Sequence, residues 1–440
     1  MKQTGRGNFN SRFGVMMAVA GSAVGLGNVW RFPYLAGQNG GGAFFIIYIA
    51  LVFLIGLPII LSEFSIGQAA GAGPMRAFRR LEGKKKTGWT SIGYISVIIG
   101  LILLGYYCVV AGWVFKFLTQ SIFVGFEGQS VEQISAVFTD FTSSTWEPIA
   151  YALAFIVVSA LIVRRGIDRG IEQWSKILMP SLFVMLVLLC INSMTLEGWD
   201  RGIDFLFNPD WSKVTGQTFV DALGQVFFTL SIGMGVMITY GSYTSRGENM
   251  FASKATSSII DTSVAILSGL IIFPAVFTFG LEAGQGPELV FLTLPSVFAQ
   301  MPFGGVLSAL FFAMLSIAAL TSAISIHELL VTTMIEQLKV SRKRAALITT
   351  LLEAGLIVVC ALSSYCFDLF DYLSANVLMP LCGLLVVVYA GWIMSPKKLR
   401  STFTSDGKYS RWIYPIFIFI VRYIAPLAIA LIFLNGFGLI

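Results

Sequence analysis

The chain has 440 residues, of which 56% are hydrophobic and only 12% are charged, with a formal net charge of +6. Soluble domains carry about 25% charged residues, so this composition excludes a soluble protein and indicates a polytopic membrane protein. The positive charge does not indicate a nucleic-acid partner, because Lys and Arg concentrate in alternate loops between apolar segments.

Apolar runs of about 20 residues, the length that crosses a bilayer, recur along the whole chain. Residues 1–12, which we expect to form a cytoplasmic N-terminal gate segment, precede a first run that has no small-residue cleavage site and leads directly into further runs, so we expect no cleavable signal peptide. We expect an all-α polytopic membrane protein with 11 transmembrane helices, at residues 13–36, 43–68, 91–122, 148–164, 172–193, 217–243, 257–280, 304–337, 342–363, 371–394 and 411–437.

The charges between these spans predict the orientation. Clusters of Lys and Arg follow spans two, four, six, eight and ten, whereas Asp and Glu predominate in the opposite loops. Because positively charged loops stay on the cytoplasmic side, we expect the N-terminus in the cytoplasm and the C-terminus outside. The expected location is the plasma (inner) membrane.

The first span is interrupted by residues 21–28, GSAVGLGN, which form a poor helix core. In lipid every backbone N–H and C=O needs a partner, so a helix that breaks at mid-depth must line a cavity or bind a ligand. Freed carbonyls can hold a cation, and the N–H groups of the next half-helix can hold an anion. The segment therefore indicates an ion-coupled transporter.

Span six has a second break, at residues 229–235, TLSIGMG. Spans one to five (13–193) and six to ten (217–394) form two sets of opposite orientation, because five is odd, and residues 411–437 follow as an extra helix. Paired breaks in inverted repeats indicate a binding site at the membrane midplane. The structural alternative is close helix packing through the GxxxG face of Gly21 and Gly25, which the second break makes the weaker interpretation.

Residues 21–34 (GSAVGLGNVWRFPY) and 39–44 (NGGGAF) resemble the signature of the neurotransmitter:sodium symporter family, above all its prokaryotic eleven-span amino-acid transporters. The resemblance extends over spans one to ten and includes Tyr106-Tyr107, Phe228-Thr229 and Thr321-Ser322. It implies an inverted-repeat fold with discontinuous helices 1 and 6. It also implies symport of an amino acid with two sodium ions by alternating access.

The resemblance implies two sodium sites made of the hard oxygen ligands that such cations prefer. Sodium site 2 would use the carbonyls of Gly21, Val24 and Ala318 and the hydroxyls of Thr321 and Ser322. Alternatively, these two hydroxyls bond back to their own helix.

Sodium site 1 would use Ala23, Asn28, Thr229 and, in span seven, Asp261. The family usually has an amide at the last position, and many animal members bind chloride through a serine one turn further on, where this chain has Ala265. Two buried Na⁺ ions are costly without a compensating negative charge. We therefore expect no chloride requirement, with Asp261 as a built-in counter-charge. Proton antiport through Asp261 is a weaker hypothesis, and the structural alternative is an Asp261 that is solvated at the cytoplasmic end of its span.

The same resemblance implies a pocket for a zwitterion between the breaks. The substrate carboxylate would meet backbone N–H groups and a tyrosine hydroxyl, and the ammonium would meet carbonyls and a serine. The expected substrate-binding residues are Ala23, Leu26, Gly27, Leu103, Tyr107, Phe228, Thr229, Ser231, Met234, Ser322 and Ile326.

Two features of the pocket predict the substrate class. Monoamine transporters of the family have an aspartate where this chain has Gly25, so Gly25 favours substrates that bring their own carboxylate. The side-chain subsite is apolar, and Met234 adapts to different shapes. We expect a hydrophobic L-amino acid, aromatic ones included.

The resemblance also implies gates on both sides. An Arg31–Asp371 ion pair would close the outside, with Gln225 assisting Arg31 and Phe228 as a lid. The cytoplasmic gate would consist of Arg6, Phe9, Ser242, Tyr243 and Glu336. The alternative for Glu336 is an ordinary charged residue at the end of a helix. Gly170 and Pro180 resemble a family motif that lets the cytoplasmic half of span five unwind.

Other functions remain as alternatives. The same fold would also suit a sodium- or proton-coupled carrier of another small zwitterion, such as an osmolyte. It would likewise suit a channel or a non-transporting sensor. The paired gates favour alternating access over these last two alternatives. The sequence shows no metal cluster, nucleophile–base pair or phosphate loop, so we expect no enzymatic activity. The expected partners are lipid, sodium ions and an amino acid, and the chain could be a monomer or a homodimer.

Four intramembrane polar residues are left over. Glu63 is expected to bond backbone groups freed by the break in span six, and His327 is expected to be a satisfied structural residue. Glu328 and Glu353 receive no partner from the sequence.

Overall fold

The computed structural model describes residues 7–83, 87–244, 247, 249–280 and 289–436. All regular structure in these ranges is helical, apart from an isolated bridge between Gly41 and Pro209. The first half contains α1 (Arg12–Ala23), α2 (Phe32–Gln38), α3 (Gly42–Leu51), α4 (Leu57–Ala70), α5 (Pro74–Glu82), α6 (Thr90–Phe123), α7 (Val131–Ser143), α8 (Glu147–Val163) and α9 (Gln173–Ser193).

The second half contains α10 (Trp199–Phe207), α11 (Gly216–Thr229), α12 (Val236–Ser242), α13 (Met250–Thr278), α14 (Leu294–Ala299), α15 (Gly304–Leu338), α16 (Arg342–Leu362), α17 (Ser364–Tyr372), α18 (Met379–Val388), α19 (Pro396–Thr404), α20 (Tyr414–Phe419) and α21 (Ala425–Gly436). Seven π-helical segments join or extend these helices: η1 (Gly27–Arg31), η2 (Val52–Gly56), η3 (Ile167–Glu172), η5 (Leu289–Thr293), η6 (Leu373–Leu378), η7 (Tyr389–Ile393) and η8 (Ile420–Ile424). A 3₁₀ turn, η4 (Trp211–Lys213), precedes α11.

Eight helices of the described residues are long and apolar enough to cross a membrane, and two bent pairs raise this number to ten. The bent pairs are α1 with η1–α2, at 50°, and α7 with α8, at 79°. The predicted span at 217–243 is split by its break into α11 and α12, of 14 and 7 residues, and each is too short to cross a bilayer. The all-helical membrane fold is therefore confirmed, whereas the count of eleven spans is not.

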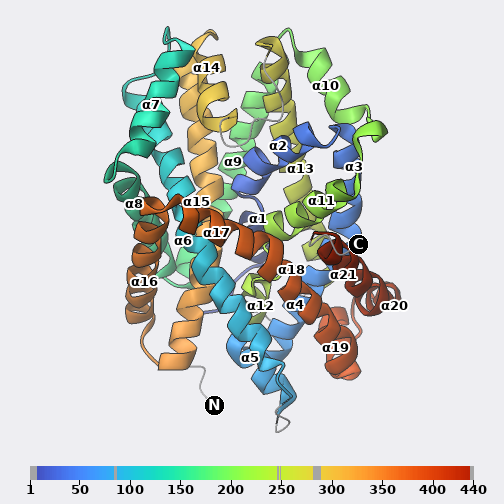
Figure 1. Ribbon diagram of the computed structural model, residues 1–440. Helices are drawn as coiled ribbons and strands as arrows, with labels where there is room; N and C mark the ends of the chain where they lie inside the picture. The colour runs from blue at the N-terminus through green and yellow to red at the C-terminus, as the bar shows by residue number, and fades with distance from the viewer. Residues whose placement is uncertain (1–6, 84–86, 245–246, 248, 281–288, 437–440) are drawn as a thin grey trace.

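Charge separates along the bundle. The basic helices α5 and α19 lie at one end of the bundle, whereas α7 and α10, in which Asp and Glu predominate, lie at the opposite end (Figure 1). This arrangement is consistent with the alternation of charge between loops.

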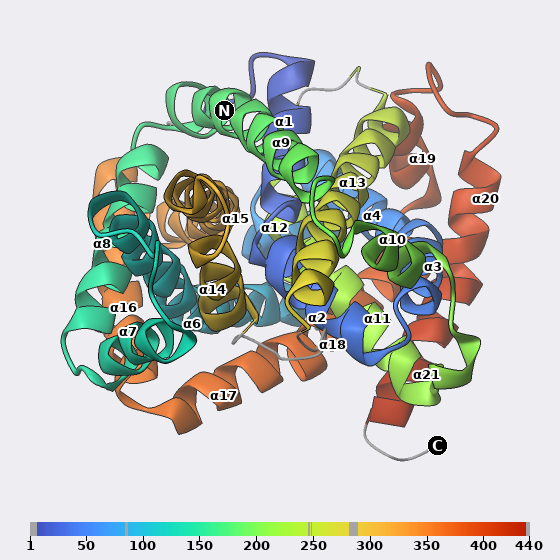
Figure 2. The ribbon, with the colours of Figure 1, turned by 90° about the horizontal axis from the view of Figure 1, so that it is seen from above.

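The two broken helices meet in the middle of the bundle. In the view from above, α12 lies near the centre, with α15 on one side and α4 and α13 on the other (Figure 2). α1 contacts α12, and η1 contacts α11. Each break therefore faces the other broken helix, and the long helices α6 and α15, which pack on each other, stand beside them.

The break in the second broken helix has a local cause. Ser231, Gly233 and Gly235 have φ values of 51°, 78° and 79°, and this left-handed region suits glycine and interrupts a right-handed helix. Close packing then fixes the inner half: a Cβ on Gly67 of α4 would lie 1.9 Å from the Ile238 carbonyl oxygen of α12. The glycine thus lets the two helices approach at backbone distance.

Candidate functional site

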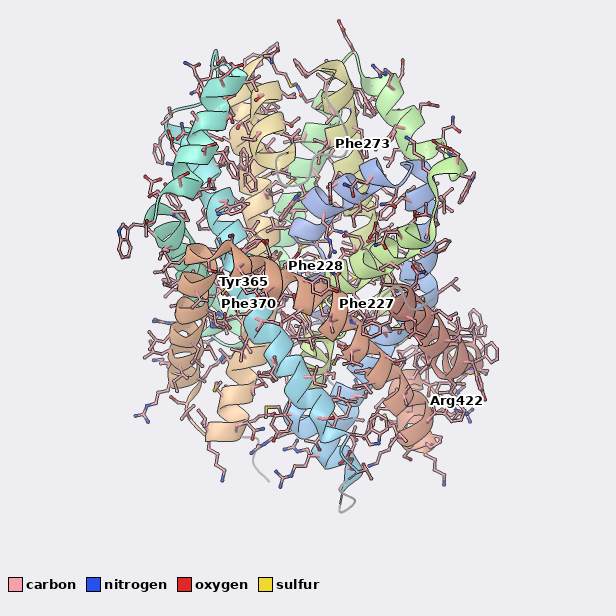
Figure 3. The ribbon with its side chains drawn as sticks, in the orientation of Figure 1. Phe227, Phe228, Phe273, Tyr365, Phe370 and Arg422 are labelled. Carbon is pink, nitrogen blue, oxygen red and sulfur yellow. The ribbon has the colours of Figure 1, made fainter. Side chains whose placement is uncertain are left out.

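A cavity lies between the two breaks, α6 and α15. Its lining residues are Ser22, Ala23, Gly25, Leu26, Gly27, Leu103, Tyr107, Phe228, Thr229, Ser231, Met234, Ser322 and Ile326. Every residue predicted to bind substrate is among them, and Ser22 and Gly25 are additional. Figure 3 shows Phe228 at mid-height of the bundle, where the breaks lie.

The cavity wall combines apolar side chains with polar atoms that lack a partner. Leu103, Met234 and Ile326 are apolar and buried, whereas the hydroxyls of Ser22 and Tyr107 are buried without a hydrogen bond among the described residues. Unsatisfied buried hydroxyls cost free energy, and a ligand with polar groups would satisfy them. Ser22 was not predicted as a lining residue, although it is the only hydroxyl in the GSAVGLGN segment.

The cavity is narrow in this conformation. The volume that the centre of a water molecule could occupy in it is about 20 Å³. This is room for roughly one water molecule. Binding of a ligand larger than water therefore requires the wall to move outward, and the wall includes both breaks.

Gly25, in the first break, faces Tyr107 and Ser322 across the cavity. A Cβ at this position would lie 2.6 Å from the Ser322 hydroxyl and 3.2 Å from the Tyr107 hydroxyl. A side chain of any size would therefore fill the space next to the unpartnered hydroxyl of Tyr107.

The predicted ligands of sodium site 2 lie together between α1 and α15. Thr321 Oγ1 lies 3.0 Å from the Ala318 carbonyl oxygen and 3.5 Å from that of Val24. Ser322 Oγ lies 3.3 Å from the Val24 carbonyl oxygen and 3.5 Å from that of Gly21. All these atoms are oxygens, which is the donor set that a hard cation takes.

The structural alternative for this site coexists with the predicted one. Thr321 Oγ1 also lies 3.1 Å from the Ile317 carbonyl oxygen of its own helix, as serine and threonine hydroxyls commonly do. Ser322, in contrast, directs its hydroxyl to carbonyls of α1 and its break, with the Ser22 carbonyl oxygen at 3.2 Å. The pair therefore bridges the broken helix and α15.

Asp261 lies at the centre of the predicted sodium site 1. It is fully buried in α13, and its Oδ1 accepts hydrogen bonds from Asn28 Nδ2 at 2.7 Å and Thr229 Oγ1 at 2.8 Å. Its Oδ2 accepts a hydrogen bond from the Tyr48 hydroxyl at 3.2 Å. The alternative of a solvated carboxylate at the end of its span is therefore wrong.

Two residues complete this site. Asn28 Oδ1 accepts the Gly25 backbone N–H at 3.1 Å, so that Asn28 ties the first break to Asp261. Ala23, the remaining predicted ligand, is buried in the cavity wall. Tyr48 of α3 was not predicted, because nothing in the sequence links it to a residue 213 positions away.

The outer gate residues lie near one another without the predicted contacts. No ion pair joins Arg31 to Asp371 among the described residues; instead the Arg31 guanidinium lies 5.2 Å from the centre of the Phe228 ring, and its Nη1 has no partner. The expected contact of Gln225 with Arg31 is absent, because Gln225 Nε2 donates to the Gly27 carbonyl at 2.8 Å. Closure of this gate by Arg31 and Asp371 stays a prediction for another conformation.

The residues predicted for the cytoplasmic gate make several contacts. The Phe9 N–H donates to the Tyr243 carbonyl at 3.4 Å, and the Phe9 ring meets Tyr240 edge-on at 5.7 Å. Glu336 accepts the Gly73 N–H at 2.9 Å, and Ser242 bonds within its own helix. Arg6, the remaining predicted member, lies outside the described residues.

Glu328, which received no partner from the sequence, forms a network with Tyr243 and Arg342 beside the residues predicted for this gate. The Tyr243 hydroxyl donates to Glu328 at 2.6 Å, and Arg342 pairs with the same carboxylate. Arg342 Nε also donates to the Val163 carbonyl at 2.9 Å, which links the gate to α8. No local sequence pattern pairs Glu328 with Tyr243 or Arg342, so the sequence predicted Tyr243 as a gate residue without revealing this partner.

Two expectations for buried polar residues agree with the structure. Glu63 accepts the Gly233 N–H at 2.7 Å in the second break. His327 is held by Ser159 at 3.2 Å and Thr349 at 3.0 Å, as a satisfied structural residue is. Glu353 is buried with no hydrogen bond to either carboxyl oxygen among the described residues.

The predicted weak segment of span five contains a helical irregularity. Gly170 lies in the π-helix η3, and Pro180 lies inside α9, which follows without interruption. A proline removes one helix hydrogen bond, and π-helical turns often mark functional positions.

The comparison with protein-family models gives one match. The model described as the sodium:neurotransmitter symporter family matches residues 6–130 and 123–438. An "uncharacterized sodium-dependent transporter" of Bacillus subtilis (strain 168), YhdH, is 35% identical over 441 residues, which cover 98% of this chain and 97% of the relative. A human relative, "sodium- and chloride-dependent GABA transporter 2", is 27% identical and matches 92% of this chain and 76% of its own length.

Among solved structures, the crystal structure of MhsT in complex with L-phenylalanine is similar to this chain. The TM-score is 0.91 at 36% sequence identity, and the match covers 98% of this chain and all of MhsT. The similarity therefore extends over both broken helices and the cavity between them.

Proposed function

The chain belongs to the sodium:neurotransmitter symporter family, and from this premise we propose that it imports a hydrophobic L-amino acid, aromatic ones included, together with Na⁺. Membership and fold make it a multi-pass, sodium-dependent membrane transporter. The amino acid, the number of ions, the independence from chloride and the orientation in the plasma membrane are the finer parts of the proposal.

The observation that carries the proposal is the cavity between the two breaks. Ser22 and Ala23 of α1, Ser322 of α15 and Thr229 of α11 line it, and the Thr229 hydroxyl donates to the Asp261 carboxylate behind the cavity wall. Oxygen clusters on both sides of a cavity suit cations, and backbone N–H groups after the first break suit a carboxylate. A zwitterion that binds beside Na⁺ fits this combination.

The substrate class follows from the cavity wall. The Tyr107 hydroxyl has no hydrogen-bond partner among the residues that the structure describes and would bind the substrate carboxylate, while Gly25 supplies no competing charge. Leu103, Met234 and Ile326 would surround an apolar side chain. The similarity to MhsT, whose structure contains L-phenylalanine, supports an aromatic substrate.

Two sodium ions would occupy the sites around Thr321 and Asp261. The Asp261 carboxylate would replace the chloride that the name of the human relative includes, because a fixed negative charge offsets part of the cost of a buried cation. The contacts that close the cytoplasmic side support alternating access rather than a continuous pore.

The substrate prediction is tested by uptake into proteoliposomes with an inward Na⁺ gradient. Tyrosine, tryptophan, phenylalanine and leucine are expected to compete for uptake, whereas glycine and proline are not, because small side chains leave the apolar subsite unfilled. Uptake should saturate and disappear when K⁺ replaces Na⁺. Preferential competition by glycine, proline or an osmolyte would contradict the substrate class, and non-saturable flux would indicate a channel.

A second prediction concerns sodium site 2. Thr321→Val keeps the shape of the side chain and removes its hydroxyl, so the Na⁺ concentration for half-maximal uptake should rise about tenfold or more, since a polar contact to a charge contributes about 1.5–3 kcal/mol. Thr333→Val is the matched control, because the Thr333 hydroxyl donates to the Leu329 carbonyl of the same helix. Equal Na⁺ dependence of the two variants would exclude Thr321 as a ligand.

A further inference from the structure

Glu172 is a buried carboxylate for which the proposed transport mechanism has no role. It lies at the end of η3, and the residue is 1% exposed. Its oxygens accept hydrogen bonds from the Asn10 backbone N–H at 2.7 Å and the Ser11 hydroxyl at 2.7 Å. Lys176, one turn further along the same span, donates at 2.6 Å. The carboxylate thus joins span five to the segment that starts α1.

The contact is made at the first turn of α1. Ser11 is the N-cap of α1, and its hydroxyl accepts the Gly14 N–H at 3.0 Å while donating to Glu172. The N-terminal N–H groups of a helix lack partners within the helix, and a negative charge there is favourable. Glu172 therefore caps α1 through Ser11 and adds a counter-charge to its dipole.

The two backbones fit closely at this point. A Cβ on Gly14 would lie 2.3 Å from a carboxylate oxygen of Glu172, so only glycine leaves room for the carboxylate beside the first turn. The position of Glu172 against α1 is consequently fixed by packing as well as by hydrogen bonds.

α1 has 12 residues and ends at the first break. Gly21 lies in its last turn and Val24 is its C-cap, and the carbonyls of both belong to the predicted sodium site 2. A movement of its cytoplasmic end would displace these carbonyls, because the helix between them is continuous.

The carboxylate keeps its position only while span five is helical. Glu172 and Lys176 pair at a spacing of four residues, which places side chains together on a helix but not in an unwound chain. Glu172 lies between Gly170 and Pro180, in the π-helical start of this span. Unwinding of that segment would separate the pair and withdraw the cap from Ser11.

We propose that Glu172 is a latch, a positioning residue that couples unwinding of span five to release of α1. In this mechanism one event opens a path for water toward sodium site 2 and frees the helix whose carbonyls hold the ion. The inference rests on the proposed function, because it assigns a step in sodium release.

Hydrogen–deuterium exchange of the full chain in detergent, with and without Na⁺, tests the latch. In Glu172→Gln, amide exchange in residues 12–17 should rise about fivefold, which corresponds to the loss of a charged helix cap. Ser11→Ala removes the contact from the other side, and exchange in residues 167–176 should then rise as well. This reciprocity would not arise from a merely local structural role.

Glu147→Gln is the matched control, because Glu147 pairs with Lys116 at 3.4 Å on the exposed side of α8 and touches neither segment. Transport gives a second readout: Glu172→Gln should raise the Na⁺ concentration for half-maximal uptake about threefold to tenfold, since α1 leaves the closed position more often. Wild-type exchange in both segments should fall together on addition of Na⁺.

The outcomes separate the latch from the proposed function. If Na⁺ protects both segments in the wild type but Glu172→Gln and Ser11→Ala exchange like the control, the latch is wrong and the symporter assignment stands. If Na⁺ changes exchange nowhere in the wild type and drives no uptake, the proposed function itself is wrong.

Discussion

Asp261→Asn is expected to lower Na⁺-driven uptake in chloride-free medium by about 100-fold, because breaking a buried ion pair costs about 3 kcal/mol or more. The substitution keeps the size of the side chain and removes the negative charge that faces Asn28 and Thr229. Uptake by proteoliposomes in gluconate medium, normalised to the amount of reconstituted protein, measures the effect.

A chloride rescue experiment makes this prediction specific. Ala265 is fully buried one helical turn from Asp261, and Asp261→Asn with Ala265→Ser places a hydroxyl donor there. We expect uptake by the double variant to require added chloride, whereas the wild type is indifferent to it. Asp221→Asn is the control, since Asp221 accepts hydrogen bonds from Gln217 and Asn39 away from the cavity. If Asp261→Asn transports normally without chloride and gains nothing from it, Asp261 is not the counter-charge.

Gly25→Ala is expected to weaken amino-acid binding by about 10- to 100-fold, in line with the roughly 1–3 kcal/mol cost of overpacking. The added Cβ would lie 2.6 Å from the Ser322 hydroxyl and 3.2 Å from the Tyr107 hydroxyl, so it takes space that the substrate carboxylate needs. Thermal stabilisation of the purified protein by amino acid and Na⁺ measures the loss.

Gly355→Ala is the matched control for this substitution. Gly355 lies in α16, and a Cβ there meets nothing within 4 Å, so alanine should support the helix without touching the site. Wild-type affinity in Gly25→Ala would mean that the carboxylate binds elsewhere in the cavity. A loss of affinity in both variants would mean that the effect is not local.

The sequence was sufficient for features that follow from local chemistry in lipid. A buried helix in a membrane must satisfy its own backbone, so GSAVGLGN and TLSIGMG could be recognised as breaks without knowing what surrounds them. The resemblance to a family then placed the cavity residues, and the structure brings all of them to one space. The span count was harder to predict, because α11 and α12 are individually shorter than a bilayer-crossing helix.

The tertiary structure alone decided which distant polar groups meet. Tyr48 binds Asp261 and Ser11 binds Glu172 across separations of 213 and 161 residues. The Gln225 side-chain amide donates a hydrogen bond to the Gly27 carbonyl and does not contact Arg31 as predicted. Such partners are selected by helix packing and by the cost of leaving buried charges unpaired, and neither depends on a spacing that a single sequence shows. The sequence by itself therefore determined where the helices break and which residues line the break, whereas packing determined which charges hold the broken helices in place.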